Sequence, residues 1–157
     1  MEEIFFGIRR AVLSDIDDIA ELTKEAFTKY RSCSGAQHVA ALEETYADIK
    51  SDVENKLVLV AFERNVIVGC VRLEVSPDNK AYLTRFAVRN NKSNSGIGKV
   101  LINTAVGIMR DANVEEILLH TCRTVKPLMY FYESCGFHLL SSDNSRGYER
   151  ALLSKKL

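Results

Sequence analysis

The sequence has no excess of charge of either sign, since 21 lysines and arginines balance 21 aspartates and glutamates in 157 residues. Proteins that bind nucleic acid depend on a basic surface for their affinity, so no nucleic-acid partner is expected, although a local site for an anion remains open. No apolar stretch approaches the ~20 residues that a membrane-spanning helix needs. We therefore expect no membrane partner.

Metal-binding spacings are also missing. The four cysteines include no Cys-x-x-Cys pair, and the three histidines have neither zinc-protease nor zinc-finger spacing. We expect no metal site and four reduced thiols. The segment 1–4 is acidic and lacks the features of a signal peptide, which favours a cytoplasmic location. Without repeats or a linker, residues 1–157 are expected to form a single domain.

The first third of the chain indicates a strand followed by two helices. Phe5–Arg10 is predicted to be extended, and Ser14 is predicted to be the N-cap of a helix with an acidic first turn. Apolar residues then recur at helical spacing as far as Phe27. The polar stretch Tyr30–Gln37 is predicted to be a loop, and Val39–Ser51 a second helix.

The remainder is richer in β-branched residues. Leu57–Phe62 and Val66–Val75 predict a hairpin, and a turn at Ser76–Asn79 leads into a strand at Lys80–Val88. Further predicted elements are the helix Gly98–Ala112, the strand Glu116–Thr121, the helix Lys126–Ser134, and a final strand pair at Phe137–Leu140 and Tyr148–Leu153.

The resulting order is β-α-α-β-β-β-α-β-α-β-β. It predicts the α/β (α+β) class, with a mixed, mostly antiparallel sheet of about seven strands and helices on both faces. The strand–helix–strand unit from Lys80 to Thr121 should join two parallel strands.

The stretch Asn90–Leu101 lies between a predicted strand and a predicted helix. Gly96 and Gly98 can adopt positive φ, and the free N–H groups of a helix start suit a phosphate; Lys92 and Lys99 could add charge. A Walker loop would need Ser or Thr at Val100, and a dinucleotide fingerprint would need a third glycine at Leu101. The pattern argues against an ATP- or NAD-binding domain, and a plain turn with two glycines is the alternative.

Two stretches carry a family resemblance: Phe86-Ala87-Val88 followed by Gly96-Ile97-Gly98-Lys99-Val100-Leu101, and Phe131-Tyr132-Glu133-Ser134-Cys135-Gly136-Phe137. The first is similar to the acetyl-CoA motif, and the second to the second signature, of the GNAT superfamily of N-acetyltransferases. The resemblance implies acetyl-CoA as cosubstrate and the fold described above. It implies that the pantetheine arm bonds to the backbone at Phe86, Ala87 and Val88. Amides holding the pyrophosphate would come from Ser93, Asn94, Ser95, Gly96, Ile97, Gly98 and Lys99.

The chemistry that the resemblance implies is direct attack of a primary amine on the thioester, through a tetrahedral intermediate. Tyr132 stands at the position of the family's general acid, and a phenol with an ordinary pKa of ~10 can donate to a thiolate. The base is less defined, because Thr84 stands where many relatives carry Glu. Glu74 is the predicted base, with His120 or a water relay as alternatives.

Three residues depart from the family pattern: Ser93, Asn94 and Val125 replace Arg or Gln, Gly, and Asn. A CoA-binding regulatory module without turnover is therefore the alternative function. The acceptor is expected to be a small-molecule or peptide amine that contacts the region 30–38 and the residues Asp143, Asn144 and Tyr148. Glu43 and Glu44 could attract a cationic amine, or could be solvated helix charges. A homodimer is expected by analogy alone.

Overall fold

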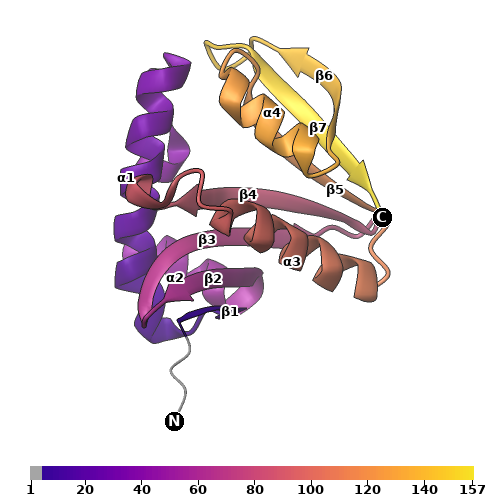
Figure 1. Ribbon diagram of the computed structural model, residues 1–157. Helices are drawn as coiled ribbons and strands as arrows, with labels where there is room; N and C mark the ends of the chain where they lie inside the picture. Colours follow the sequence, from indigo (N-terminus) through magenta and orange to yellow (C-terminus); the bar gives the residue numbers. More distant parts are fainter. Residues whose placement is uncertain (1–4) are drawn as a thin grey trace.

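The computed structural model describes residues 5–157; residues 1–4, used above against a signal peptide, lie outside that range. A seven-stranded sheet with the order β1-β2-β3-β4-β5-β7-β6 forms its centre (Figure 1). Among the described residues, β4 and β5 form the one parallel pair. The predicted mixed, mostly antiparallel sheet is confirmed. Its strands are β1 (Phe6–Arg10), β2 (Leu57–Glu63), β3 (Val66–Val75), β4 (Lys80–Val88), β5 (Glu116–Cys122), β6 (His138–Asp143) and β7 (Arg150–Lys156).

Four α-helices cover the two faces of the sheet: α1 (Ile16–Ser34), α2 (Tyr46–Asn55), α3 (Ile97–Asp111) and α4 (Lys126–Ser134). Ile19 of α1 and Ile49 of α2 share a core with β2, β3 and β4, whereas Leu101 of α3 and Met129 of α4 belong to the core on the opposite face. Helices on both faces were predicted, and this is confirmed. No helix within residues 5–157 is long and apolar enough to cross a membrane.

The start of α1 differs from the sequence prediction. Ser14 is not the N-cap, because a 3₁₀ turn, Leu13–Asp15, precedes the helix. The carboxylate of Asp15 accepts the Val12 N–H at 2.8 Å and pairs with Arg9 of β1 at 2.7 Å. Asp15 therefore satisfies the Val12 amide at the start of the 3₁₀ turn, and its ion pair with Arg9 ties the helix start to the sheet.

The predicted loop Tyr30–Gln37 is wrong over most of its length, because α1 continues to Ser34. The hydroxyls of Ser32 and Ser34 donate to carbonyls within the helix, so these polar residues are accommodated without breaking it. Gly35, at φ 72°, ends the helix and donates to Arg31 O at 3.1 Å.

The predicted helix Val39–Ser51 is also wrong in its bounds. A 3₁₀ turn, Ala40–Glu43, is followed by an extended Glu44, and α2 begins only at Tyr46. Thr45 and Asp48 form a capping box: the Thr45 hydroxyl accepts the Asp48 N–H, and the Asp48 carboxylate accepts the Thr45 N–H. This box fixes the helix start, and α2 then runs on to Asn55.

Candidate active site

The sheet splits between its two parallel strands. β4 and β5 pair only from Lys80 to Tyr82 and from Glu116 to Leu118. Beyond that point β5 follows β7 as far as Cys122, while β4 follows β3 as far as Val88. Figure 1 shows β5, β6, β7 and α4 diverging from the other strands. The β5-facing edge of β4 after Tyr82 is thus left without a strand partner.

A β-bulge lies in this unpaired part of β4. Cys70 pairs with Ala87 and Arg72 pairs with Thr84, so β4 has one more residue than β3 over this interval. Arg85 has φ 53°, a conformation that costs a residue with a Cβ about 1–3 kcal/mol. The bulge directs Phe86 toward the α3/α4 core and Ala87 into the α1/α2 core. It adjoins the three residues predicted to bind pantetheine, Phe86, Ala87 and Val88.

The loop before α3 presents unused hydrogen-bond donors. Gly96, at φ 88°, is the N-cap of α3, and Asn94 also has positive φ. Between Asn94 and Lys99, five amides donate to no backbone carbonyl of the described residues: Asn94, Gly96, Ile97, Gly98 and Lys99. The amides of Ser93 and Ser95 instead bond inside the loop, to Asn90 O and Lys92 O. Free amides at a helix start form a ready anion site.

Side chains around the loop hold it in place and do not all face a ligand. Lys92, considered above as a source of charge for a phosphate, lies 2.7 Å from Glu63 of β2. The Glu25 carboxylate of α1 accepts the Asn90 N–H at 2.7 Å. Lys99 is exposed. At Gly98, a Cβ would lie 3.0 Å from Phe86 Cζ, which explains the second glycine of the motif.

Tyr132 lies in an aromatic cluster on the α3/α4 side of the split. Its ring contacts Phe131 and Phe137 edge-on, and Phe131 stacks on Phe86 of β4 at 5.3 Å between ring centroids. Burial raises the pKa of Tyr132, which keeps the phenol protonated. Tyr132 is 6% exposed, and no described residue is hydrogen-bonded to its hydroxyl, so the hydroxyl is free to donate to a bound group.

The two candidate bases lie on the opposite, α1/α2 side. Glu74 of β3 pairs in register with Tyr82 of β4, and the Tyr82 ring stacks on His120 at 6.1 Å. Glu74 is 63% exposed and lies 3.5 Å from Lys56. His120 is on β5, two residues beyond the last pair with β4. Burial, followed by nearby Arg150, lowers the pKa of His120, against an opposing effect of Asp143.

The predicted acceptor regions do approach the split. Tyr30 lies in the last turns of α1. Its pKa is raised mainly by burial and next by the nearby Tyr148, with smaller effects of Cys122 and Tyr132. Tyr30 of α1, Tyr148 of the β6–β7 connection and Tyr132 of the aromatic cluster therefore lie near one another. Asp143 and Asn144 are exposed there.

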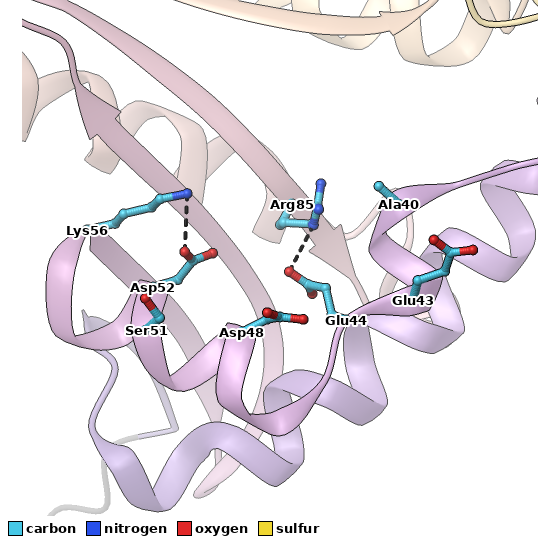
Figure 2. A pocket seen from close by; sticks show the side chains of 8 residues that line it. All are labelled: Ala40, Glu43, Glu44, Asp48, Ser51, Asp52, Lys56 and Arg85. Atoms are coloured by element: carbon cyan, nitrogen blue, oxygen red, sulfur yellow. Dashed lines mark hydrogen bonds and ion pairs between the residues drawn. The ribbon is translucent and has the colours of Figure 1, made fainter.

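A cavity of about 420 Å³ opens between α2, the preceding 3₁₀ turn and β4 (Figure 2). Glu43 and Asp48 face it from exposed positions, whereas Glu44 is only 10% exposed. Arg85, at the bulge, forms the β4 wall. The lining residues are Ala40, Glu43, Glu44, Asp48, Ser51, Asp52, Lys56 and Arg85, so four carboxylates face two cations.

Sequence reasoning missed the ion pairs behind this cavity. Arg72 is fully buried and binds Glu44 through both terminal nitrogens and Asp52 through one. Glu44 also accepts from Arg85 Nε at 3.2 Å. Glu44 is thus neither a solvated helix charge nor a free carboxylate. An arginine at an inward-facing position of an apolar strand was the available signal, because a charge there needs a partner.

Comparison with known proteins agrees with this geometry. Residues 16–137 match the model of the acetyltransferase (GNAT) family. A spermidine N(1)-acetyltransferase of Thermoplasma acidophilum is 25% identical over 150 residues, covering 88% of this chain and 91% of the relative.

Solved structures share the fold. The PaiA N-acetyltransferase of Thermoplasma acidophilum, in complex with coenzyme A, superposes with a TM-score of 0.85 at 22% identity, covering 98% of this chain and 100% of that one. A ribosomal-protein-alanine N-acetyltransferase of Brucella melitensis gives 0.77 at 17% identity, covering 96% and 99%. The chain belongs to the GNAT family, and is an N-acetyltransferase that uses acetyl-CoA as cosubstrate.

Proposed function

We propose that the chain acetylates a primary amine of a small linear polycation, a substrate of the polyamine class. The observation that carries this proposal is the cavity beside the bulge, in which carboxylates outnumber cations. Arg72, Arg85 and Lys56 pair with Glu44 and Asp52. Glu43, which lies beside His38, and Asp48, which uses one oxygen to cap α2, pair with none of these three cations and can face a ligand. The spermidine specificity in the name of the Thermoplasma relative supports the same class.

In the proposed mechanism, acetyl-CoA supplies the thioester and lies in the split between β4 and β5. The free amides from Asn94 to Lys99 hold the pyrophosphate, with the backbone of Phe86, Ala87 and Val88 along the pantetheine arm. The amine attacks from the α1/α2 side and forms a tetrahedral intermediate. Tyr132, on the other side, donates its proton to the departing thiolate.

For the base, we propose His120 in preference to Glu74. His120 lies on the strand that borders the split, and its lowered pKa leaves the imidazole neutral and able to accept a proton near neutral pH. Glu74 lies one strand further away and pairs with Lys56. Glu74 or a water molecule would take the proton of the amine only if substrate binding brought that group next to the amine.

The pH profile distinguishes these bases. A base that is protonated in acid is lost as the pH falls through its pKa, so kcat should drop through a midpoint below the ordinary histidine value of 6.5. His120→Gln should remove that step and lower kcat at neutral pH by roughly 10²-fold or more. Glu74→Gln should keep the step. The reverse pattern, with the step lost only in Glu74→Gln, would restore Glu74 as the base.

The substrate class is tested by steady-state acetylation of spermidine, a linear diamine, alaninamide and an alanine-terminated peptide, with thiol release as the signal. Spermidine should give the highest kcat/KM. Glu43→Gln should raise KM for spermidine about 3- to 10-fold through a lost ion pair, with KM for acetyl-CoA unchanged. Glu54→Gln is the control: it removes an exposed carboxylate of α2 that lies outside the cavity. Preference for the peptide would overturn the polycation proposal, and binding without turnover would favour a regulatory module.

Other expectations from the sequence remain predictions. We infer that residues 1–157 form one acetyltransferase domain, located in the cytoplasm. A homodimer is proposed through the edge strand β6, where Leu139 and Leu140 are exposed.

A further inference from the structure

We infer that Glu44 is a positioning residue for acetyl transfer, which holds the β4 bulge through its ion pair with Arg85. This inference rests on the proposed function, because the bulge affects catalysis only if the acetyl group binds beside it. Glu44 touches neither reacting group in this arrangement. It acts through the backbone of β4.

Glu44 is well fixed for such a role. It lies on the extended residue between the 3₁₀ turn and α2, and its two oxygens accept from the terminal nitrogens of Arg72 at 2.5 and 3.0 Å. The Arg72 side chain is 0% exposed, so packing on every side restricts its movement. The oxygen at 2.5 Å also accepts from Arg85 Nε at 3.2 Å. One carboxylate thus joins a buried cation of β3 to the bulged residue of β4.

The bulge is a part of the fold that needs such a support. Arg85 has φ 53°, and strained conformations persist only where their surroundings hold them. The other non-glycine residues of positive φ within residues 5–157 lie in turns or loops: Arg64, Asn65, Asn79, Asn94 and Asn113. Arg85 is the one such residue inside a strand. Without its tether, β4 can relax toward regular pairing and shift the amides that follow.

Neighbouring acids do not contact Arg85. Glu43 is exposed and lies 3.2 Å from His38. Asp52 binds Arg72 and Lys56 and has no contact with Arg85. Within the described chain, Glu44 is the carboxylate that reaches Arg85.

The first test is Glu44→Gln. A displacement of the bulge by about 1 Å should lower kcat roughly 10- to 100-fold. KM for the amine should change less than about 3-fold, because the substitution removes no contact with the bound amine. Asp15→Asn is the control: it also weakens an ion pair of a buried carboxylate, here with the partly exposed Arg9, and should lower Tm without changing kcat. A raised amine KM with normal kcat would make Glu44 a substrate ligand and overturn the inference.

Substitutions at Arg85 test the same link without touching Arg72. Arg85→Met removes the ion pair with Glu44 but keeps a side chain at a backbone position of positive φ, and it should lower kcat as much as Glu44→Gln does. Arg85→Gly removes both, and because glycine adopts positive φ readily, it should retain at least about ten times the kcat of Arg85→Met. Equal losses in both variants would assign the effect to the guanidinium itself and contradict the inference.

NMR of the backbone amides separates this inference from the proposed function, because it needs no turnover. The Ala87 and Val88 resonances should shift in Glu44→Gln and Arg85→Met, and shift less in Arg85→Gly. Unmoved resonances in a folded Glu44→Gln protein would overturn the positioning role and leave the acetyltransferase proposal intact. If the resonances shift as expected but the protein acetylates none of the amines tested, Glu44 supports the bulge and the polycation substrate is refuted.

Discussion

Replacing Tyr132 by phenylalanine should lower kcat by roughly 10²- to 10⁴-fold, the usual contribution of a general acid. The thiolate of CoA would leave without a proton donor, because the ring of phenylalanine carries none. Binding of acetyl-CoA should persist, with its dissociation constant within about 3-fold of the original. The measurement is steady-state thiol release combined with calorimetric titration of acetyl-CoA.

Tyr132→Phe should remove the hydroxyl without disturbing the packing around the ring. The Tyr132 hydroxyl bonds to no described residue, so its removal leaves no buried group without a partner. The ring contacts with Phe86, Phe131 and Phe137 are all available to phenylalanine. Stability should therefore change little, and a loss of kcat would report the chemistry.

Tyr130→Phe is the matched control. Tyr130 lies on the same helix and is 64% exposed, so losing its hydroxyl should leave both kcat and stability unchanged. If Tyr132→Phe kept full turnover, a solvent proton or another side chain would have to protonate the thiolate, and the assignment of Tyr132 would fail.

The parts of the fold that depend on periodicity were predictable from the sequence. The hairpin β2–β3, the strand β4 and the helix α4 follow from runs rich in Val, Leu and Ile, from turn residues, and from the glycine that ends the helix. The region 30–46 was not, because its serines occur in both loops and helices and its glycine marks only where a helix can end. What decided it were interactions such as the Thr45–Asp48 capping box and the pairing of Glu44 with Arg72 from a distant strand.

The candidate site likewise has one part that the sequence predicts and another that it does not. The phosphate loop lies in one short segment, so Gly96 and Gly98 could be identified from sequence. The acidic cavity combines α2 with β4, and the bulge at Arg85 depends on how β3 and β4 pair. The pair Glu43–Glu44 was a local signal for acidity, but nothing local showed that β4 and its bulge lie opposite these acids. His120 and Tyr82 lie in contact although 38 positions separate them, a proximity that only the parallel pairing of β4 and β5 creates.

Replacing Gly96 by valine should weaken acetyl-CoA binding by roughly 10- to 100-fold, because the loop would lose the conformation that presents its amides. Gly96 has φ 88°, and a Cβ there would meet nothing within 4 Å. The expected damage is therefore strain of the backbone, not collision. A β-branched residue in this region costs about 1–3 kcal/mol, and each 1.4 kcal/mol is tenfold in affinity.

Two further glycine substitutions isolate that cause. Gly107→Val adds the same side chain in α3, where φ is ordinary and a Cβ also meets nothing within 4 Å, so acetyl-CoA should bind normally. Gly96→Asn should bind nearly normally as well, since asparagine tolerates positive φ, as Asn94 does at φ 64° in the same loop. Calorimetric titration with acetyl-CoA measures all three. Equal weakening by valine and asparagine would show that any side chain at position 96 obstructs the cofactor, whereas unaltered affinity in a folded Gly96→Val protein would place the pyrophosphate elsewhere.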